Sequence, residues 1–213
     1  MLWRSRSPQL RSKLAPLGFI QPSRPTLSKQ PPTGELWVHE VKHDGYRLQV
    51  HVRAGRVRLY TMNAADWTDR YPRIVEEAAR LKRDAVLDCE VICQDEHGRA
   101  DFDRLHSRCF EHEAIACAFD LLKLDGDDLR TRPLSERKTA LEKLLKRSRG
   151  GIQYVKHLPM SGEDAFEAAC GLELEGIVSK RLSAPYKSGP CKSWIKVRNP
   201  KSSAYMRIMD GTF

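Results

Sequence analysis

The sequence predicts an α+β fold of packed, mainly antiparallel sheets with a few flanking helices. Three observations favour this class. Runs with a strand-like pattern outnumber those with helical spacing, and tight turns such as Ala54-Gly55 and Asp125-Gly126 separate them. The chain has 213 residues, of which 40% are hydrophobic and 31% are charged, so it is long enough to bury the core of one domain or of two small ones.

Strand patterns begin near residue 35 and recur to the end of the chain. Residues 46–53 alternate apolar and polar side chains, and a two-residue turn leads into residues 56–62, which predicts a β-hairpin. The other strands are expected at residues 36–41, 85–93, 114–122, 152–158, 175–181 and 193–198.

Three segments are typical of helices. Residues 71–82 and 133–146 carry apolar residues at helical spacing, which predicts that one face of each packs against the core. A shorter helix is expected to end near Gly171, because Ser161 and Asp164 resemble a capping box at its start.

Positive charge is concentrated at the N-terminus. The net charge is +9, and residues 1–34 contribute +6 of it and contain no acid. Six prolines in this segment argue against the amphipathic helix of a transit peptide. We therefore expect a basic arm at residues 1–34 and a folded domain at residues 35–213. Such an arm often binds nucleic acid, and a solvated lead-in is the alternative.

The composition also limits location and metal chemistry. No apolar run approaches the roughly 20 residues that cross a bilayer. The six cysteines include no pair with zinc-ligand spacing. A reduced, intracellular chain without a membrane partner is expected.

The segment Glu-Val-Lys-His-Asp-Gly-Tyr-Arg at residues 40–47 lies at the joint between two expected strands. Asp44-Gly45 supplies the tight turn. A lysine fixed beside such a turn is a positionable point charge whose chemistry responds to its surroundings, so Lys42 is a candidate nucleophile. Taken alone, this motif is too short to outweigh the simpler interpretation of Lys42 as a solvated lysine on a loop.

Further charged and aromatic residues follow at strand-like positions. Asp88 and Glu90 stand two residues apart on an apolar strand and therefore face the same side. Burying two carboxylates without a purpose is costly. The residues that accompany Lys42 are Glu40, Arg47, Glu90, Phe119, Glu175, Lys180, Lys196 and Arg198.

This ordered series resembles the catalytic (adenylation) domain of ATP-dependent DNA ligases of the bacterial end-joining type, which are covalent nucleotidyltransferases. The resemblance covers residues 19–213. It implies a nucleotidyltransferase fold, similar to ATP-grasp folds, with an ATP cleft between two sheets. It also implies that Lys42 attacks the α-phosphate of ATP and carries AMP as a phosphoramidate.

The resemblance implies roles for the aromatic and acidic residues. Phe119 is expected to stack on adenine, with Glu40 beside the base. Glu90 is expected to contact the ribose or a metal, and Glu175 to help hold a divalent metal. Carboxylate oxygens suit Mg²⁺ or Mn²⁺, and Mg²⁺ also keeps several waters and binds substrate phosphates.

The basic residues are expected to bind the nucleotide and to favour a neutral amine. The resemblance places Lys196 on the α-phosphate. Arg47, Lys180 and Arg198 add positive charge, which favours the neutral form of a lysine whose usual pKa is about 10.4. For any one of these cations alone, surface solubility is the simpler explanation.

The sequence departs from the family pattern at three places. Met62 stands where the family usually has an arginine fork, and Cys89 stands where it usually has glycine, so we expect Cys89 to crowd the nucleotide. The chain ends at Phe213, before the OB-fold domain of full ligases. The expected partners are nicked duplex DNA and a separate DNA end-binding or OB-fold protein, in the bacterial cytoplasm near the nucleoid.

Two other functions remain as alternatives. RNA ligases and capping guanylyltransferases share the short lysine motif, but residues 67–72 and 175–181 match DNA ligases more closely. A catalytically weak DNA-binding accessory is the second alternative, and Met62 favours it. Covalent labelling by ATP, by GTP or by neither would distinguish the three.

Overall fold

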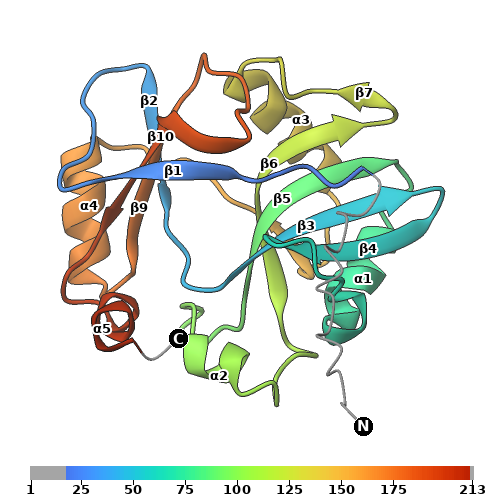
Figure 1. Ribbon diagram of the computed structural model, residues 1–213, viewed down its shortest axis with the longest axis horizontal. Helices are drawn as coiled ribbons and strands as arrows, with labels where there is room; N and C mark the ends of the chain where they lie inside the picture. The colour runs from blue at the N-terminus through green and yellow to red at the C-terminus, as the bar shows by residue number, and fades with distance from the viewer. Residues whose placement is uncertain (1–17, 212–213) are drawn as a thin grey trace, which may run out of the picture.

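The computed structural model describes residues 18–211, which form two sheets and the helices around them (Figure 1). The smaller sheet has the strand order β1-β10-β9-β2. Its strands are β1 (Ser23–Ser28), β2 (Trp37–Val41), β9 (Gly176–Arg181) and β10 (Gly189–Arg198). Only the β1–β10 pair of this sheet is parallel, so the expectation of mainly antiparallel pairing is confirmed here.

The larger sheet has the order β4-β3-β5-β6-β7, with β8 paired to β6. Its strands are β3 (Tyr46–Arg53), β4 (Arg56–Thr61), β5 (Ala85–Ile92), β6 (Ile115–Leu124), β7 (Asp127–Asp128) and β8 (Ile152–Tyr154). The predicted hairpin is confirmed, and its turn places Ala54 and Gly55 at positive φ, as a tight two-residue turn requires.

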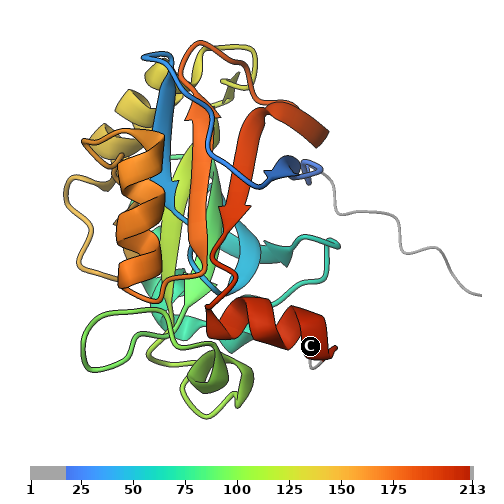
Figure 2. The same cartoon turned by 90° about the vertical axis from the view of Figure 1, so that its left-hand side faces the viewer.

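Helices flank the sheets rather than separate them (Figures 1 and 2). They are α1 (Pro72–Ala79), α2 (Phe102–His106), α3 (Leu134–Leu145), α4 (Gly162–Gly171) and α5 (Ser203–Asp210), with a 3₁₀ turn at Thr68–Arg70. The Ser161 hydroxyl accepts a hydrogen bond from the Asp164 N–H at the start of α4, so the predicted cap is confirmed. None of the helices between residues 18 and 211 has the length and apolar character needed to span a bilayer.

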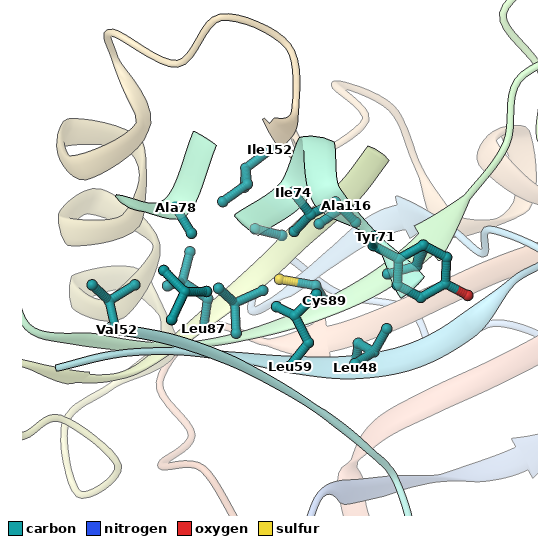
Figure 3. Close-up of a cluster of buried hydrophobic side chains, with 14 of the residues drawn as sticks. Leu48, Val52, Leu59, Tyr71, Ile74, Ala78, Leu87, Cys89, Ala116 and Ile152 are labelled. Carbon is teal, nitrogen blue, oxygen red and sulfur yellow. The ribbon is translucent and has the colours of Figure 1, made fainter. Parts of the chain in front are cut away.

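The main hydrophobic core lies between the larger sheet and the helices α1 and α3 (Figure 3). Leu48 and Leu59 from the sheet and Ile74 from α1 are fully buried there. Each such side chain stabilises the fold by about 1.5–3 kcal/mol. Cys89 belongs to the same core, packed among apolar side chains. The expectation that Cys89 crowds the nucleotide is therefore wrong, since its side chain points away from the carboxylate face of β5.

The predicted start of the fold near residue 35 is also wrong. Ser23–Ser28 form β1, an edge strand that runs parallel to β10. Pro25 fits there because the edge of a sheet tolerates a residue without an N–H donor. The sequence gives no local sign of this pairing, since the two strands lie more than 160 residues apart. The remaining cations of the expected arm, Arg4, Arg6, Arg11 and Lys13, lie outside the described residues.

Candidate active site

A cavity of about 320 Å³ opens between the two sheets. Seven of the nine predicted site residues line it: Glu40, Lys42, Arg47, Glu90, Phe119, Lys180 and Lys196. A second, larger cavity of about 1120 Å³ is lined by Glu175 and shares only Val41, Lys42 and His43 with the first. Lys42 therefore lies where the two cavities meet. Arg198 lies two residues beyond Lys196 on β10 and lines neither cavity.

The backbone around Lys42 is held on both sides. The Lys42 N–H donates to the Gly176 carbonyl at 2.9 Å, just after β2 ends. In the turn that follows, a Cβ on Gly45 would lie 2.1 Å from the Val91 carbonyl oxygen, so glycine is required there. The Lys42 ammonium donates to Glu175 Oε2 at 2.6 Å. These contacts fix the amine at the point where the two cavities join.

One end of the smaller cavity is aromatic. Phe119 and Trp194 meet edge to face, with ring centroids 6.0 Å apart. The Lys180 ammonium lies 4.4 Å from the centroid of Phe119 and 4.3 Å from that of Trp194, and the Arg47 guanidinium lies 4.9 Å from Phe119. Cations over aromatic faces are attracted by the ring quadrupole. The arrangement offers an apolar, flat-sided site suited to a planar base.

Glu40 is buried between two lysines. Its Oε1 accepts from Lys138 at 2.6 Å, and its Oε2 accepts from Lys180. Burial alone would raise the pKa of Glu40, but Lys180 and Lys138 outweigh burial and hold that pKa well below its usual range. Sequence reasoning missed Lys138, which lies on α3 and is only 2% exposed. Its signal was a second charged residue, next to Arg137, on the core-facing side of a helix whose other buried residues are leucines.

Arg47 is held by Asp88, the other carboxylate of β5 that the sequence analysis named beside Glu90. Two parallel hydrogen bonds of 2.8 and 2.7 Å join the Arg47 guanidinium to Asp88. The Tyr186 hydroxyl donates to the same carboxylate at 2.6 Å. Arg47 also donates to the Ser23 carbonyl at 2.9 Å, which ties β1 to the wall of the cavity. Arg47 therefore positions neighbouring groups in addition to facing the cavity.

Glu90 and Glu175, the two carboxylates expected to hold a metal, both interact electrostatically with Lys42. Burial raises the pKa of Glu90 to about 7, although Lys42 and Arg47 oppose the shift, and Glu175 raises it further. Burial also raises the pKa of Glu175, against the effect of Lys42. Between residues 18 and 211 no group of three or more acidic, histidine or cysteine side chains has the arrangement of a metal site. Two carboxylates fit a Mg²⁺ ion that takes its other ligands from water and phosphate.

Positive charge gathers at the end of β10. Burial lowers the pKa of Lys196, and Arg198 and Lys42 lower it further. The Arg198 side chain has a buried Nε without a hydrogen-bond partner in the described part of the chain. An anionic ligand would satisfy these groups, because charge-assisted hydrogen bonds to phosphate are strong.

Comparison with known protein families decides the assignment. Residues 26–198 match the model of the ATP dependent DNA ligase domain. The chain belongs to this family. The ligase domain is 38% identical over 185 residues to the multifunctional non-homologous end joining protein LigD of Pseudomonas aeruginosa. The aligned region covers 84% of this chain and 22% of that protein. It is 39% identical over 179 residues to a probable DNA ligase of Streptomyces griseus, covering 75% of this chain and 35% of the relative.

Solved structures show the same fold. The ligase domain superimposes on a mycobacterial DNA ligase D, solved in complex with ATP and MES, with a TM-score of 0.75 and 30% identity. The match covers 84% of this chain and 60% of the mycobacterial chain. The ligase domain thus spans well under half of its curated relatives named above and somewhat more than half of the solved chain.

The structure adds residues that the sequence did not indicate. Ser23, Arg24 and Pro25 of β1 line the smaller cavity, although the sequence placed them in the basic arm. Met62, the departure from the family pattern, also lines it and is 50% exposed. The three β1 positions could not be found from local patterns, because β1 reaches the cavity only through its pairing with β10, whereas Met62 had been singled out from the sequence.

Proposed function

We propose that this ligase domain forms a lysyl-AMP intermediate and that the protein seals nicks in duplex DNA. One observation carries the proposal: the Lys42 amine, bonded to Glu175, lies at the junction of an aromatic, cation-lined cavity with a larger open one. The smaller cavity suits a nucleotide. The larger one gives a second substrate access to the same amine.

In the first step, the neutral Lys42 amine attacks the α-phosphate of ATP, and the bond to the β-phosphate breaks, releasing pyrophosphate. The amine must lose a proton, and Glu175 Oε2 at 2.6 Å is its hydrogen-bond partner. AMP then passes to a 5′-phosphate on DNA, and the phosphoramidate bond breaks. Attack by the 3′-hydroxyl forms the phosphodiester and releases AMP. Holding the reacting groups in line supplies most of such catalysis.

The remaining predicted residues support these steps. Phe119 and Glu40 contact the adenine end, and Arg47 and Lys180 complete the wall around it. Lys196 and Arg198 stabilise charge on the α-phosphate. Glu90 and Glu175 would hold Mg²⁺ or Mn²⁺, which would neutralise phosphate charge during transfer. A separate DNA end-binding or OB-fold protein is the proposed partner at the DNA, in the bacterial cytoplasm near the nucleoid.

Covalent labelling tests the proposal directly. The wild type, incubated with α-labelled ATP and Mg²⁺, should acquire label that resists denaturing electrophoresis. Lys42→Ala should acquire none, because the nucleophile is removed. Lys143→Ala is the matched control, since Lys143 is an exposed lysine on α3 that lines neither cavity. Circular dichroism would confirm that both variants remain folded.

The other outcomes are equally informative. Full labelling of Lys42→Ala would show that another residue is the nucleophile. Label from GTP but not from ATP would indicate a capping enzyme. No label from either nucleotide on the wild type would contradict the proposal and favour a DNA-binding accessory.

A further inference from the structure

The strand β1 forms part of the cavity wall, and its backbone is firmly placed. The Ser23 N–H donates to the Tyr186 hydroxyl at 2.9 Å, and the Ser23 carbonyl accepts from Arg47 at 2.9 Å. The neighbouring Pro22 carbonyl accepts from the Gly189 N–H at 3.0 Å. Arg24 follows directly and lines the cavity. Arg24 therefore belongs to an edge strand paired with β10 rather than to an unpaired arm.

The charges around the cavity leave two cations unpaired. Five lysine and arginine residues line it: Arg24, Lys42, Arg47, Lys180 and Lys196. Three of them bond carboxylates, as Lys42 does with Glu175, Arg47 with Asp88 and Lys180 with Glu40. Within residues 18–211, Arg24 and Lys196 have no ion pair and no side-chain hydrogen bond. They are the cations that an incoming anion meets without first breaking an existing pair.

These two cations lie on neighbouring strands. In the β1–β10 register, Arg24 stands opposite Pro190 and Leu27 stands opposite Lys196, and the pairing is irregular between Pro25 and Thr26. Three residues of strand span about 10 Å, so the two cations are spaced along the cavity rather than clustered. Met62, at the end of the edge strand of the other sheet, also lines the cavity, and its thioether cannot pair with an anion. Arg24 is thus the free guanidinium of this wall.

We propose that Arg24 is a phosphate-binding residue of the cavity, supplied by β1. The role rests on the proposed nucleotidyl transfer, but it makes a separate claim about binding. A guanidinium presents a planar fork of donors that matches phosphate oxygens. The phosphate belongs either to ATP or to the 5′ end of the nicked strand, and the chemistry of recognition is the same for both.

Equilibrium binding tests the role without requiring catalysis. The wild type, Arg24→Ala, Arg24→Lys and Arg56→Ala are titrated at one salt concentration with ATP and with adenosine by calorimetry. The same proteins are titrated with nicked duplexes that carry or lack the 5′-phosphate by fluorescence anisotropy. Arg56 is the matched control, because it is an exposed arginine at the start of β4 that does not line the cavity.

We expect Arg24→Ala to weaken binding of one phosphate ligand about tenfold, as for the loss of a hydrogen bond to a charged group. A loss confined to ATP, with adenosine unchanged, assigns Arg24 to the nucleotide. A loss of the preference for the 5′-phosphate assigns it to the DNA end. Arg24→Lys should fall between the wild type and Arg24→Ala, and Arg56→Ala should match the wild type.

Several results would overturn the role. Unchanged affinity of Arg24→Ala for both ligands would do so, and so would equal losses for ATP and adenosine. A wild type that binds neither ATP nor the 5′-phosphorylated nick would refute it as well. If the wild type binds ATP but is never labelled, the proposed function fails, and the dissociation constants still decide the role of Arg24.

Discussion

Buried charged pairs hold the site residues in place. Glu40, Asp88 and Asp120 are each at most 2% exposed, and each carboxylate bonds a basic side chain. Replacing a whole buried pair by apolar residues is often neutral for stability, whereas removing one partner is costly. We interpret these pairs as devices that fix side-chain orientation. Sequence analysis named Glu40 as a candidate site residue, and its position lines the smaller cavity, but it did not name the lysine of α3 that bonds Glu40.

Removing the negative charge of Glu40 should destabilise the fold in a pH-dependent way. At neutral pH, Glu40→Gln leaves Lys138 and Lys180 buried without a carboxylate, which should cost about 3–5 kcal/mol. Because the pKa of Glu40 is lowered in the folded state, its stabilising effect is complete above the usual glutamate pKa and is lost as the pH falls below it. The difference between wild type and variant should therefore shrink below pH of about 4.

Urea unfolding at a series of pH values measures this difference. Glu142→Gln is the control, since Glu142 is an exposed acid on the same helix as Lys138. Its stability should stay within about 0.5 kcal/mol of the wild type. A deficit of Glu40→Gln that is small at neutral pH, or that grows on acidification, would contradict the pairing.

At the level of elements, local patterns predicted most strands and the longer helices. The hairpin β3–β4, the buried strands β5 and β6, and the helix α3 appear where alternation or helical spacing placed them. The short helices α2 and α5 and the strand β1 were missed. The strand β1 is polar, contains Pro25 and depends on a distant partner, so no window of sequence around it carries the signal.

Stepwise deletion should show that β1 belongs to the site. A chain that starts at residue 18 keeps every described element, so it should acquire label from ATP at the wild-type rate. A chain that starts at residue 29 lacks β1, and with it the Ser23 carbonyl that Arg47 bonds and the Arg24 guanidinium. We expect it to lose labelling and to unfold at lower urea concentration. Equal labelling of the two chains would show that β1 is dispensable.

At the scale of the whole molecule, the two sheets contribute different parts of one cavity. The smaller sheet supplies Glu40, Lys180 and Lys196, and the larger sheet supplies Glu90 and Phe119. The order of these residues along the chain could be read from the sequence, and the family resemblance implied that they meet. Their distances depend on how the sheets pack, which no local pattern encodes. That is why the junction of two cavities at Lys42 appears only in the structure.

Dependence on a divalent cation tests the cavity as a whole. Chelation with EDTA should abolish covalent labelling, because without the metal the carboxylates proposed to hold it, Glu90 and Glu175, would only repel the phosphates of ATP. Excess Mg²⁺ or Mn²⁺ should restore it, and Ca²⁺, which prefers more ligands and longer bonds, should restore less. The circular dichroism spectrum should not change on chelation. Undiminished labelling in EDTA would show that the two carboxylates have another role.

The pairing of β1 with β10 also determines when the site is built during synthesis. The ribosome releases Ser23–Ser28 early, but the residues that pair with them lie at positions 189–197. Contacts between such distant segments are slow to form, because a long loop must close before they bring any gain. The larger sheet and its core can collapse first, since their strands are close in sequence. We therefore expect the smaller cavity to be completed last, and a nascent chain released before β10 to carry a core without that cavity.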